Sequence, residues 1–471
     1  MISNNNGSSL IAGRIGQTGG MQSKPVDPWA APLAPGPVDA VVTVPGSKSV
    51  TNRALVLAAL ADGPSRISGP LRARDTLLMA GALRALGVGV TDAGEDWRVV
   101  PAPLCGPATV DVGNAGTVLR FVPPVAALAA GPVHFDGDPR ARERPVAPLL
   151  AALRELGAEI DDGGRGALPL TLHGDGGLPG GRTTIDASSS SQLVSGLLLA
   201  AARYGKGLRL RHAGPPVPSA LQLAMTVQML REAGVAVAER STPDGHEWTV
   251  EPGPVRAVDW AVAPDLSTAA PFAAAALVAG GRVRVPGWPR RAYQPGDRLP
   301  GLLTEMGARC TLDSGGLTVA ADGGIEGIDA NLADCGELTP VLAALAALAR
   351  TPSTLRGVAH LRGQETDRLA ALSREINALG GDVTETPDGL RIVPRPLHGG
   401  VFATYDDHRL AMAGAVLGLA VPGVEVANVA TTGKTVADFP ARWLAMLGLA
   451  EPGLAKPAEL GLAELGQEPA R

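Results

Sequence analysis

A helix-ending signal recurs six times along this chain at nearly constant spacing. At each place an amphipathic pattern closes with an apolar residue and then Gly, the residue that most often takes the left-handed conformation just after a helix. The glycines are Gly87, Gly157, Gly234, Gly307, Gly380 and Gly448, and subtraction of their numbers gives intervals of 70, 77, 73, 73 and 68 residues. Such regular self-similarity indicates one supersecondary unit used six times.

Each unit also opens in the same way, with a polar cluster that leads into a helix of small, apolar residues. About forty residues separate each opening from its closing Gly. A helix that is apolar on all sides must be buried, so we expect one inner helix and one outer amphipathic helix in each unit. Runs such as 249–252 and 390–394 are the expected covering strands. The openings are residues 48–49, 114–117, 188–192, 265–268, 334–337 and 407–409.

The repeat and the length together predict an α/β protein of the α+β type with two similar domains. A chain of 471 residues is too long for one ordinary core. We expect three βαβαββ-like units in each domain, with buried parallel helices and the sheets outside. Domain 1 should hold residues 37–46 plus 263–451, and domain 2 residues 47–262. The chain would then cross twice, near Pro45–Gly46 and Ala263–Pro264, and these crossings are the expected hinge.

Composition limits where in the cell this protein is expected to act and which partners it is expected to bind. Residues 1–36 are polar, then Pro-rich, and show no secretory signal, so we expect a disordered extension there and a disordered tail at 452–471. No apolar run is long enough to cross a bilayer, and a net charge of −5 argues against non-specific nucleic-acid binding. The three cysteines lack metal-like spacing and suggest reduced thiols. We expect a cytoplasmic monomer.

The openings point to an anion site. In residues 44–53, Lys48 and Arg53 lie among hydroxyl and amide side chains at the start of a helical run. Helix N-termini attract anions, and stacked units would bring six such ends together. Helix capping explains the Ser, Asp and Asn residues at these ends, but not the recurrent Lys, Arg, Gln and His. The pattern therefore favours a site for a phosphorylated small molecule.

Six motifs, in order along the chain from about residue 40 to 450, resemble the 5-enolpyruvylshikimate-3-phosphate synthase family. The resemblance implies the enolpyruvyl transferase fold. It also implies transfer of the enolpyruvyl group of phosphoenolpyruvate to the 5-hydroxyl of shikimate 3-phosphate, with release of phosphate. This reaction belongs to the shikimate pathway of aromatic amino acid biosynthesis and is the target of glyphosate. The motifs are residues 45–53, 113–117, 143–145, 190–192, 365–368 and 407–409.

The same resemblance assigns site residues, and it implies neither a cofactor nor a metal. The expected catalytic residues are Lys48, Glu337 and Glu365. Phosphoenolpyruvate would contact Lys48, Asn114, Gly116, Arg144, Gln192, Arg368, Arg409 and Lys434. Shikimate 3-phosphate would contact Lys48, Ser49, Arg53, Ser190, Ser191, Gln192, Ser219, Glu337 and Gln364.

The implied reaction is an addition followed by an elimination through a tetrahedral intermediate. Glu337 is placed to take the proton of the 5-hydroxyl, Glu365 to move the proton at C3, and Lys48 to help phosphate leave. A carboxylate among many cations stays ionised, which suits Glu337 as an acceptor and suits Glu365 less well as a donor.

Three positions depart from the family pattern. Glu337 stands where many members have Asp, and Gln364 stands where many have Lys and others His. Gln222 replaces an aromatic residue that often follows the position of Ser219. None of these changes removes the core set of cations and carboxylates, so we still expect activity.

Other readings fit the chain less well. A UDP-N-acetylglucosamine enolpyruvyl transferase would carry a loop cysteine, but residues 138–145 contain no thiol. A P-loop is excluded because Asn428 stands where that motif needs Gly. A non-catalytic paralogue that binds phosphorylated metabolites is disfavoured by the intact Lys48, Glu337 and Glu365. Two roles stay open for His408, which are hydrogen bonding within the core and contact with substrate. Two also stay open for Arg120, which either adds positive field to the site or forms a structural ion pair.

Overall fold

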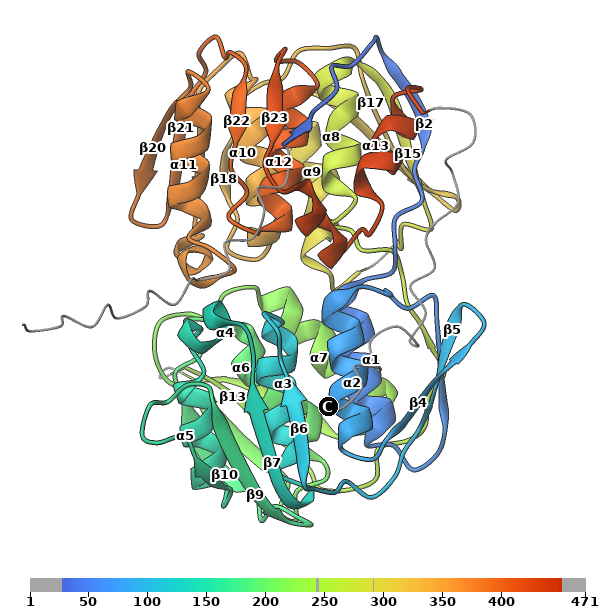
Figure 1. Cartoon of the computed structure of the whole chain (residues 1–471), viewed down its shortest axis with the longest axis vertical. Coiled ribbons are helices and arrows are strands. Elements are labelled where there is room, and N and C mark those ends of the chain that lie inside the picture. The colour runs from blue at the N-terminus through green and yellow to red at the C-terminus, as the bar shows by residue number, and fades with distance from the viewer. Residues whose placement is uncertain (1–27, 243–244, 291, 451–471) are drawn as a thin grey trace, which may run out of the picture.

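The computed structural model describes residues 28–242, 245–290 and 292–450 (Figure 1). All six closing glycines have left-handed backbone, with φ between 70° and 106°. Each one follows an outer helix at the position that the repeat predicts, so that prediction is confirmed. The outer helices are α2 (Arg74–Ala85), α5 (Ala147–Glu155), α7 (Ala220–Glu232), α9 (Leu299–Glu305), α11 (Arg368–Ala378) and α13 (Phe439–Met446).

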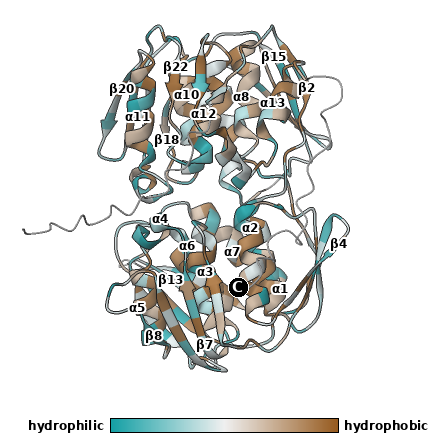
Figure 2. Cartoon of the chain, viewed as in Figure 1, coloured by the Kyte–Doolittle hydropathy of each residue, from teal (hydrophilic) through white to brown (hydrophobic). Residues whose placement is uncertain are grey.

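The six inner helices begin within the predicted polar clusters or within two residues after them, and they are buried along most of their length. In α3, α10 and α12 every residue is buried. Figure 2 shows that they are mainly hydrophobic in composition. They form two groups of three, α1 with α3 and α6, and α8 with α10 and α12. Their bounds are α1 (Lys48–Ala59), α3 (Gly116–Ala126), α6 (Ser191–Ala201), α8 (Ala270–Ala279), α10 (Thr339–Ala347) and α12 (His408–Gly418).

The strands of the described residues form six sheets, five of which have four strands in one common order. In one example, β18 (Asp329–Asn331) runs parallel to β19 (Ser353–Arg356), and β21 (Gly389–Val393) runs antiparallel to both β19 and β20 (Asp382–Thr386). With α10 and α11 between them, these strands make the expected βαβαββ unit.

The other sheets repeat this order, and the last has three strands. Their strands are β6 (Ala108–Asp111), β7 (Ala130–Asp136), β9 (Leu170–Asp175) and β8 (Glu159–Asp161); β10 (Gly181–Ile185), β11 (Leu208–His212), β13 (Gly245–Val250) and β12 (Val237–Thr242); β14 (Trp260–Ala261), β3 (Ser65–Ser68), β5 (Asp96–Val100) and β4 (Gly89–Ala93); β16 (Arg309–Asp313), β17 (Gly316–Ala321), β15 (Gly281–Pro286) and β2 (Val38–Val41); β1 (Trp29–Ala30), β23 (Val424–Val426) and β22 (Gly400–Phe402).

Two strands, β2 and β14, each join a sheet whose other strands are distant from them in sequence. β2 pairs in parallel with β15, while β14 pairs in parallel with β3. The chain therefore passes twice between the two groups of units. The passes lie side by side, because Gly46 and Pro264 form an antiparallel bridge. They occur at the predicted crossing points.

The buried apolar residues form two separate cores. One combines residues 31–44 with residues 266–447, and the other lies within residues 54–260. This separation supports the division into 37–46 plus 263–451 and 47–262, which we retain as a proposal. We refer to these parts as the first and second halves.

One prediction about the N-terminal segment is corrected. Trp29 and Ala30 form β1, which pairs antiparallel with β23, and the N–H of Ala31 donates to the carbonyl of Val424 at 2.9 Å. Trp29 also packs edge-on against Phe439, with ring centroids 6.4 Å apart. Residues 29–36 are thus part of the first half, and not of a disordered extension. The predictions for residues 1–27 and 452–471 lie outside the described residues.

The crossing at Gly46 leaves no room for a side chain. A Cβ there would lie 2.2 Å from the carbonyl oxygen of Gly69 and 2.9 Å from Cγ1 of Val262. We expect Gly46→Ala to destabilise the protein by about 1–3 kcal/mol, because a backbone oxygen cannot swing aside as a flexible side chain can. Thermal denaturation measures this effect, with Gly36→Ala as control, since a Cβ at Gly36 meets nothing within 4 Å. Equal melting temperatures for the two variants would contradict the expected clash.

Candidate active site

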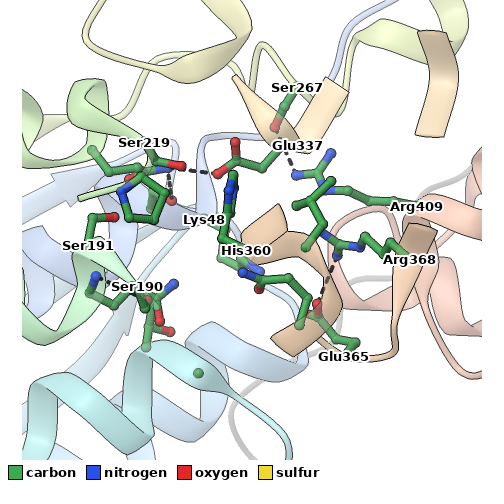
Figure 3. Close-up of a pocket in the computed structure, with 18 of the residues that line it drawn as sticks. Lys48, Ser190, Ser191, Ser219, Ser267, Glu337, His360, Glu365, Arg368 and Arg409 are labelled. Atoms are coloured by element: carbon green, nitrogen blue, oxygen red, sulfur yellow. Dashed lines mark hydrogen bonds and ion pairs between the residues drawn. The ribbon is translucent and has the colours of Figure 1, made fainter. Parts of the chain in front are cut away.

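The polar ends of the inner helices from both halves surround one cavity (Figure 3). Most of the residues predicted to bind substrate line it, although they come from all parts of the chain. The predicted residues in its wall are Lys48, Ser49, Gly116, Arg144, Ser190, Ser191, Gln192, Ser219, Glu337, Gln364, Glu365, Arg368 and Arg409.

Three predicted residues lie behind this wall. Arg53 is buried and donates from Nη1 to the carbonyl of Ser49 at 3.0 Å, and burial lowers its pKa to about 9. Asn114 accepts at its backbone oxygen from Nη1 of Arg144, also at 3.0 Å. Lys434 is buried and pairs with the carboxylate of Glu365. Each of the three therefore supports a residue of the wall.

A chain of alternating charges forms one side of the cavity. Arg368, the first residue of α11, lies 2.8 Å from both Oδ2 of Asp407 and Oε2 of Glu365. Burial alone would raise the pKa of Glu365, but Lys434 and Arg368 outweigh that effect and hold it well below its usual value. Glu365 is therefore ionised when no substrate is bound.

Sequence reasoning missed Asp75, a buried carboxylate of the cavity wall. It lies 3.4 Å from Nζ of Lys48 and 3.7 Å from Nζ of Lys434. Burial opposes its ionisation, yet the two lysines keep its pKa below the usual value. The pKa of Lys48 is lowered by burial, against the opposing effect of Asp75. Asp75 stands in the first turn of α2, where an acidic residue is common at any helix, so no signal set it apart.

Glu337 differs from the other acids because it is only partly bonded. It lies in the short 3₁₀ helix η2 (Gly336–Leu338), which leads into α10. Its Oε1 accepts from Nε2 of Gln222 at 3.4 Å. Its Oε2 is buried and has no hydrogen-bond partner among the described residues.

Other wall residues were missed or left open. Ser267 accepts from Nη2 of Arg409 at 3.0 Å, and Asp265 accepts from the backbone N–H of Lys48 at 3.2 Å. His408 lines the cavity, and its two ring nitrogens make no hydrogen bond with the described residues. Core hydrogen bonding of His408 is therefore not observed, and burial together with nearby cations lowers its pKa well below the usual value. Thr117, Pro218, Gln222, His360 and Leu361 complete the wall.

Arg120 supports the wall from behind. Its Nη1 donates to Oε1 of Gln192 at 3.1 Å, and its Nη2 donates to the carbonyl of Pro145 at the same distance. It makes no ion pair within the described residues, so the structural ion pair considered for it is not observed. Burial lowers its pKa to about 9.

Contacts between the two halves join them at two corners of the cavity wall. The N–H of Ser219 donates to the carbonyl of Ala333 at 2.9 Å. At the other corner Arg140, in α4 (Pro139–Glu143), donates from Nε to the carbonyl of Glu365 at 3.2 Å. The structure therefore holds the two halves together around the site.

The described residues contain no group of three or more His, Cys, Asp or Glu side chains arranged to hold a metal ion. None of their helices is long and apolar enough to pass through a membrane.

Comparisons with known proteins identify the family and the fold. The sequence model of the family described as EPSP synthase (3-phosphoshikimate 1-carboxyvinyltransferase) matches residues 33–443. A 3-phosphoshikimate 1-carboxyvinyltransferase of Kocuria rhizophila is 54% identical over an alignment of 434 residues, and the match covers 90% of this chain and 97% of that protein. Two solved structures of EPSP synthase from Acinetobacter baumannii align with TM-scores of 0.73 and 0.72, at 26% and 25% identity. Each alignment covers 89% of this chain and 98% of the other. The predicted fold class is thereby confirmed, and the chain belongs to the EPSP synthase family.

Proposed function

We propose that this protein transfers the enolpyruvyl group of phosphoenolpyruvate to the 5-hydroxyl of shikimate 3-phosphate and releases phosphate, as a 3-phosphoshikimate 1-carboxyvinyltransferase of the shikimate pathway. The observation that carries the proposal is one cavity lined by cations from both halves and by a carboxylate oxygen of Glu337 that has no hydrogen-bond partner in the described part of the chain. Both substrates are multiply anionic, so they need several cations, and the reaction needs a proton acceptor.

The phosphoenolpyruvate subsite lies among Lys48, Arg144, Arg368 and Arg409, with Lys434 behind them. Guanidinium groups suit phosphate and carboxylate because their planar fork can donate two parallel hydrogen bonds. Such fixed charges also stabilise the charge that develops on the departing phosphate. Gly116 has no side chain, so the ligand can approach the backbone at the start of α3. Asn114 holds the guanidinium of Arg144 beside it.

Shikimate 3-phosphate binds beside it, at the start of α6. Ser190 caps this helix by accepting the N–H of Gln192 at its hydroxyl, and Ser191 is the first helical residue. Two hydroxyl groups therefore lie at the positive end of the helix dipole, where an anion is favoured. Gln192, Ser49, Ser219 and Gln364 add neutral donors and acceptors. Arg53 contributes its charge from behind Ser49.

Proton transfer is divided between the two carboxylates. Oε2 of Glu337 accepts the proton of the 5-hydroxyl group while the oxygen of that hydroxyl attacks C2 of phosphoenolpyruvate. Glu365 is ionised while Lys434 and Arg368 hold it. The phosphate and carboxylate of the substrate compete for those two cations, so binding raises the pKa of Glu365 and enables it to carry a proton to and from C3. The lowered pKa of Lys48 favours donation of a proton to the leaving phosphate.

The competing readings lack support at the site. A UDP-N-acetylglucosamine enolpyruvyl transferase would use a loop thiol, and none of the three cysteines (Cys105, Cys310, Cys335) lines the cavity. A paralogue that only binds its ligands would not need a carboxylate oxygen like Oε2 of Glu337, which is left without a partner by the residues that the structure describes. We further propose a cytoplasmic monomer that acts on small molecules without nucleic acid, metal or cofactor.

One assay decides among these functions. Purified protein mixed with phosphoenolpyruvate and shikimate 3-phosphate should release inorganic phosphate, and the product plus phosphate should regenerate both substrates. Phosphate release with UDP-N-acetylglucosamine in place of shikimate 3-phosphate would support the sibling enzyme instead. Binding of both substrates with no phosphate release would support the paralogue.

Glyphosate sensitivity tests the placement of Gly116. A Cβ at Gly116 would lie 2.6 Å from Nη2 of Arg144 and 2.8 Å from Nη1 of Arg120. We expect Gly116→Ala to displace these guanidinium groups and to weaken binding of glyphosate and phosphoenolpyruvate by about 1–2 kcal/mol, or about 5–30-fold. Inhibition curves and KM measure this. Gly81→Ala is the control, because a Cβ at Gly81 meets nothing within 4 Å; an unchanged response of Gly116→Ala would contradict the placement.

A further inference from the structure

The side-chain amide of Gln222 lies between Glu337, the proposed proton acceptor, and Ser49 of the proposed shikimate 3-phosphate subsite. Its Nε2 donates to Oε1 of Glu337 and to Oγ of Ser49, each at 3.4 Å. The two hydrogens of one NH₂ group can serve both acceptors at once. Glu337 belongs to the first half and Gln222 to the second, so this contact forms where the two halves meet.

The position of Gln222 is held from several sides. Its backbone N–H donates to the carbonyl of Ser219 at 2.9 Å, and its own carbonyl accepts from Nη2 of Arg53 at 3.1 Å. Ser219 has left-handed backbone, with φ 56° and ψ 55°, and is itself bonded across the halves to Ala333. This fixed corner aims the amide at Glu337.

The contact leaves one carboxylate oxygen held and the other open. Oε1 of Glu337 has the Gln222 donor, while Oε2 is buried without a hydrogen-bond partner among the described residues. A carboxylate anchored by one oxygen presents the other in a fixed direction. An amide can do this without adding charge, whereas a cation at this place would compete for the proton.

We propose that Gln222 is a positioning residue that orients Glu337 for proton abstraction and links that orientation to occupancy of the subsite at Ser49. This inference rests on the proposed function. It also accounts for two departures from the family pattern together: the longer Glu at position 337 reaches an amide at position 222. Neither change requires a loss of activity.

The test is a double-mutant cycle in kcat with the full chain. Gln222→Met keeps the approximate size of the side chain and removes both donors, and it should lower kcat about tenfold, which is the low end expected for a hydrogen bond to a charged group. In the Glu337→Gln background the same substitution should change kcat less than threefold, because the group that it orients no longer takes a proton. A merely structural role would lower kcat equally in both backgrounds and would overturn the proposal.

Two further variants make the result specific. Gln228→Met is the matched control, since Gln228 stands on the same helix, donates to Glu232 at 2.8 Å and does not line the cavity. Gln222→Glu removes the donor and sets a negative charge beside Glu337, so its kcat should fall below that of Gln222→Met. This second variant also keeps the test open if Gln222→Met does not fold.

The outcomes separate the two proposals. If the unmodified protein releases no phosphate from its substrates, the proposed function fails. If it is active but Gln222→Met and Gln222→Glu match Gln228→Met in kcat, only the role of Gln222 fails.

Discussion

Glu337→Gln should lower kcat by about 10²–10⁴-fold and leave both KM values within a fewfold of the original. The carboxylate has one buried oxygen with no partner among the described residues, and an amide in its place cannot take the 5-hydroxyl proton. Because Gln has nearly the same shape, the loss should lie in the chemical step and not in binding. Steady-state phosphate release at saturating concentrations of both substrates measures the change.

Two comparisons make this result diagnostic. Glu326→Gln removes a carboxylate of the same half that lies at the surface, 3.8 Å from Arg350, and it should leave kcat unchanged. Equilibrium binding of shikimate 3-phosphate by Glu337→Gln should resemble that of the unmodified protein. A kcat within threefold of the original would show that another group takes the proton.

Much of the fold could be predicted because the repeat relies on local chemistry. Gly157 and Gly380, for example, mark helix ends that need left-handed backbone, and such a need shows in any single copy of the unit. Six copies of the unit together carry the signal far more clearly than one copy does. Residues 29–30 show the opposite case, since β1 exists only by pairing with β23, a strand from the far end of the chain. Local composition carries no sign of such a partner.

Site residues that stand in a motif could be predicted from the sequence. Residues whose place at the site depends on packing between units could not. Arg53 stands in a motif, but its guanidinium donates to the hydroxyl groups of Thr226 and Ser195, which another unit contributes. Asp75 lies outside the motifs, yet it is the carboxylate that faces both Lys48 and Lys434. Contacts between units distant in sequence thus determine which charged groups face the cavity and which support it.

The largest effect on stability should come from Arg368. Its side chain is 4% exposed and pairs with the side chains of Asp407 and Glu365, which are themselves buried. Arg368→Met fills similar space but leaves two buried carboxylates without this cation, and removal of one partner of a buried pair costs about 3–5 kcal/mol. We expect a marked fall in melting temperature together with loss of phosphoenolpyruvate binding. Differential scanning calorimetry at neutral pH measures the first effect.

The cause of that loss can be isolated by removing the charge left behind. Arg368→Met combined with Asp407→Asn should recover part of the melting temperature, because Asn still offers an oxygen to cap α12 but carries no buried charge. Phosphoenolpyruvate binding should not recover, since the cation stays absent. Arg395→Met is the matched control, because Arg395 pairs with Asp382 at the surface and such exposed pairs contribute little. If Arg368→Met has the same melting temperature as Arg395→Met, other groups compensate the buried charges, and Arg368 serves binding alone.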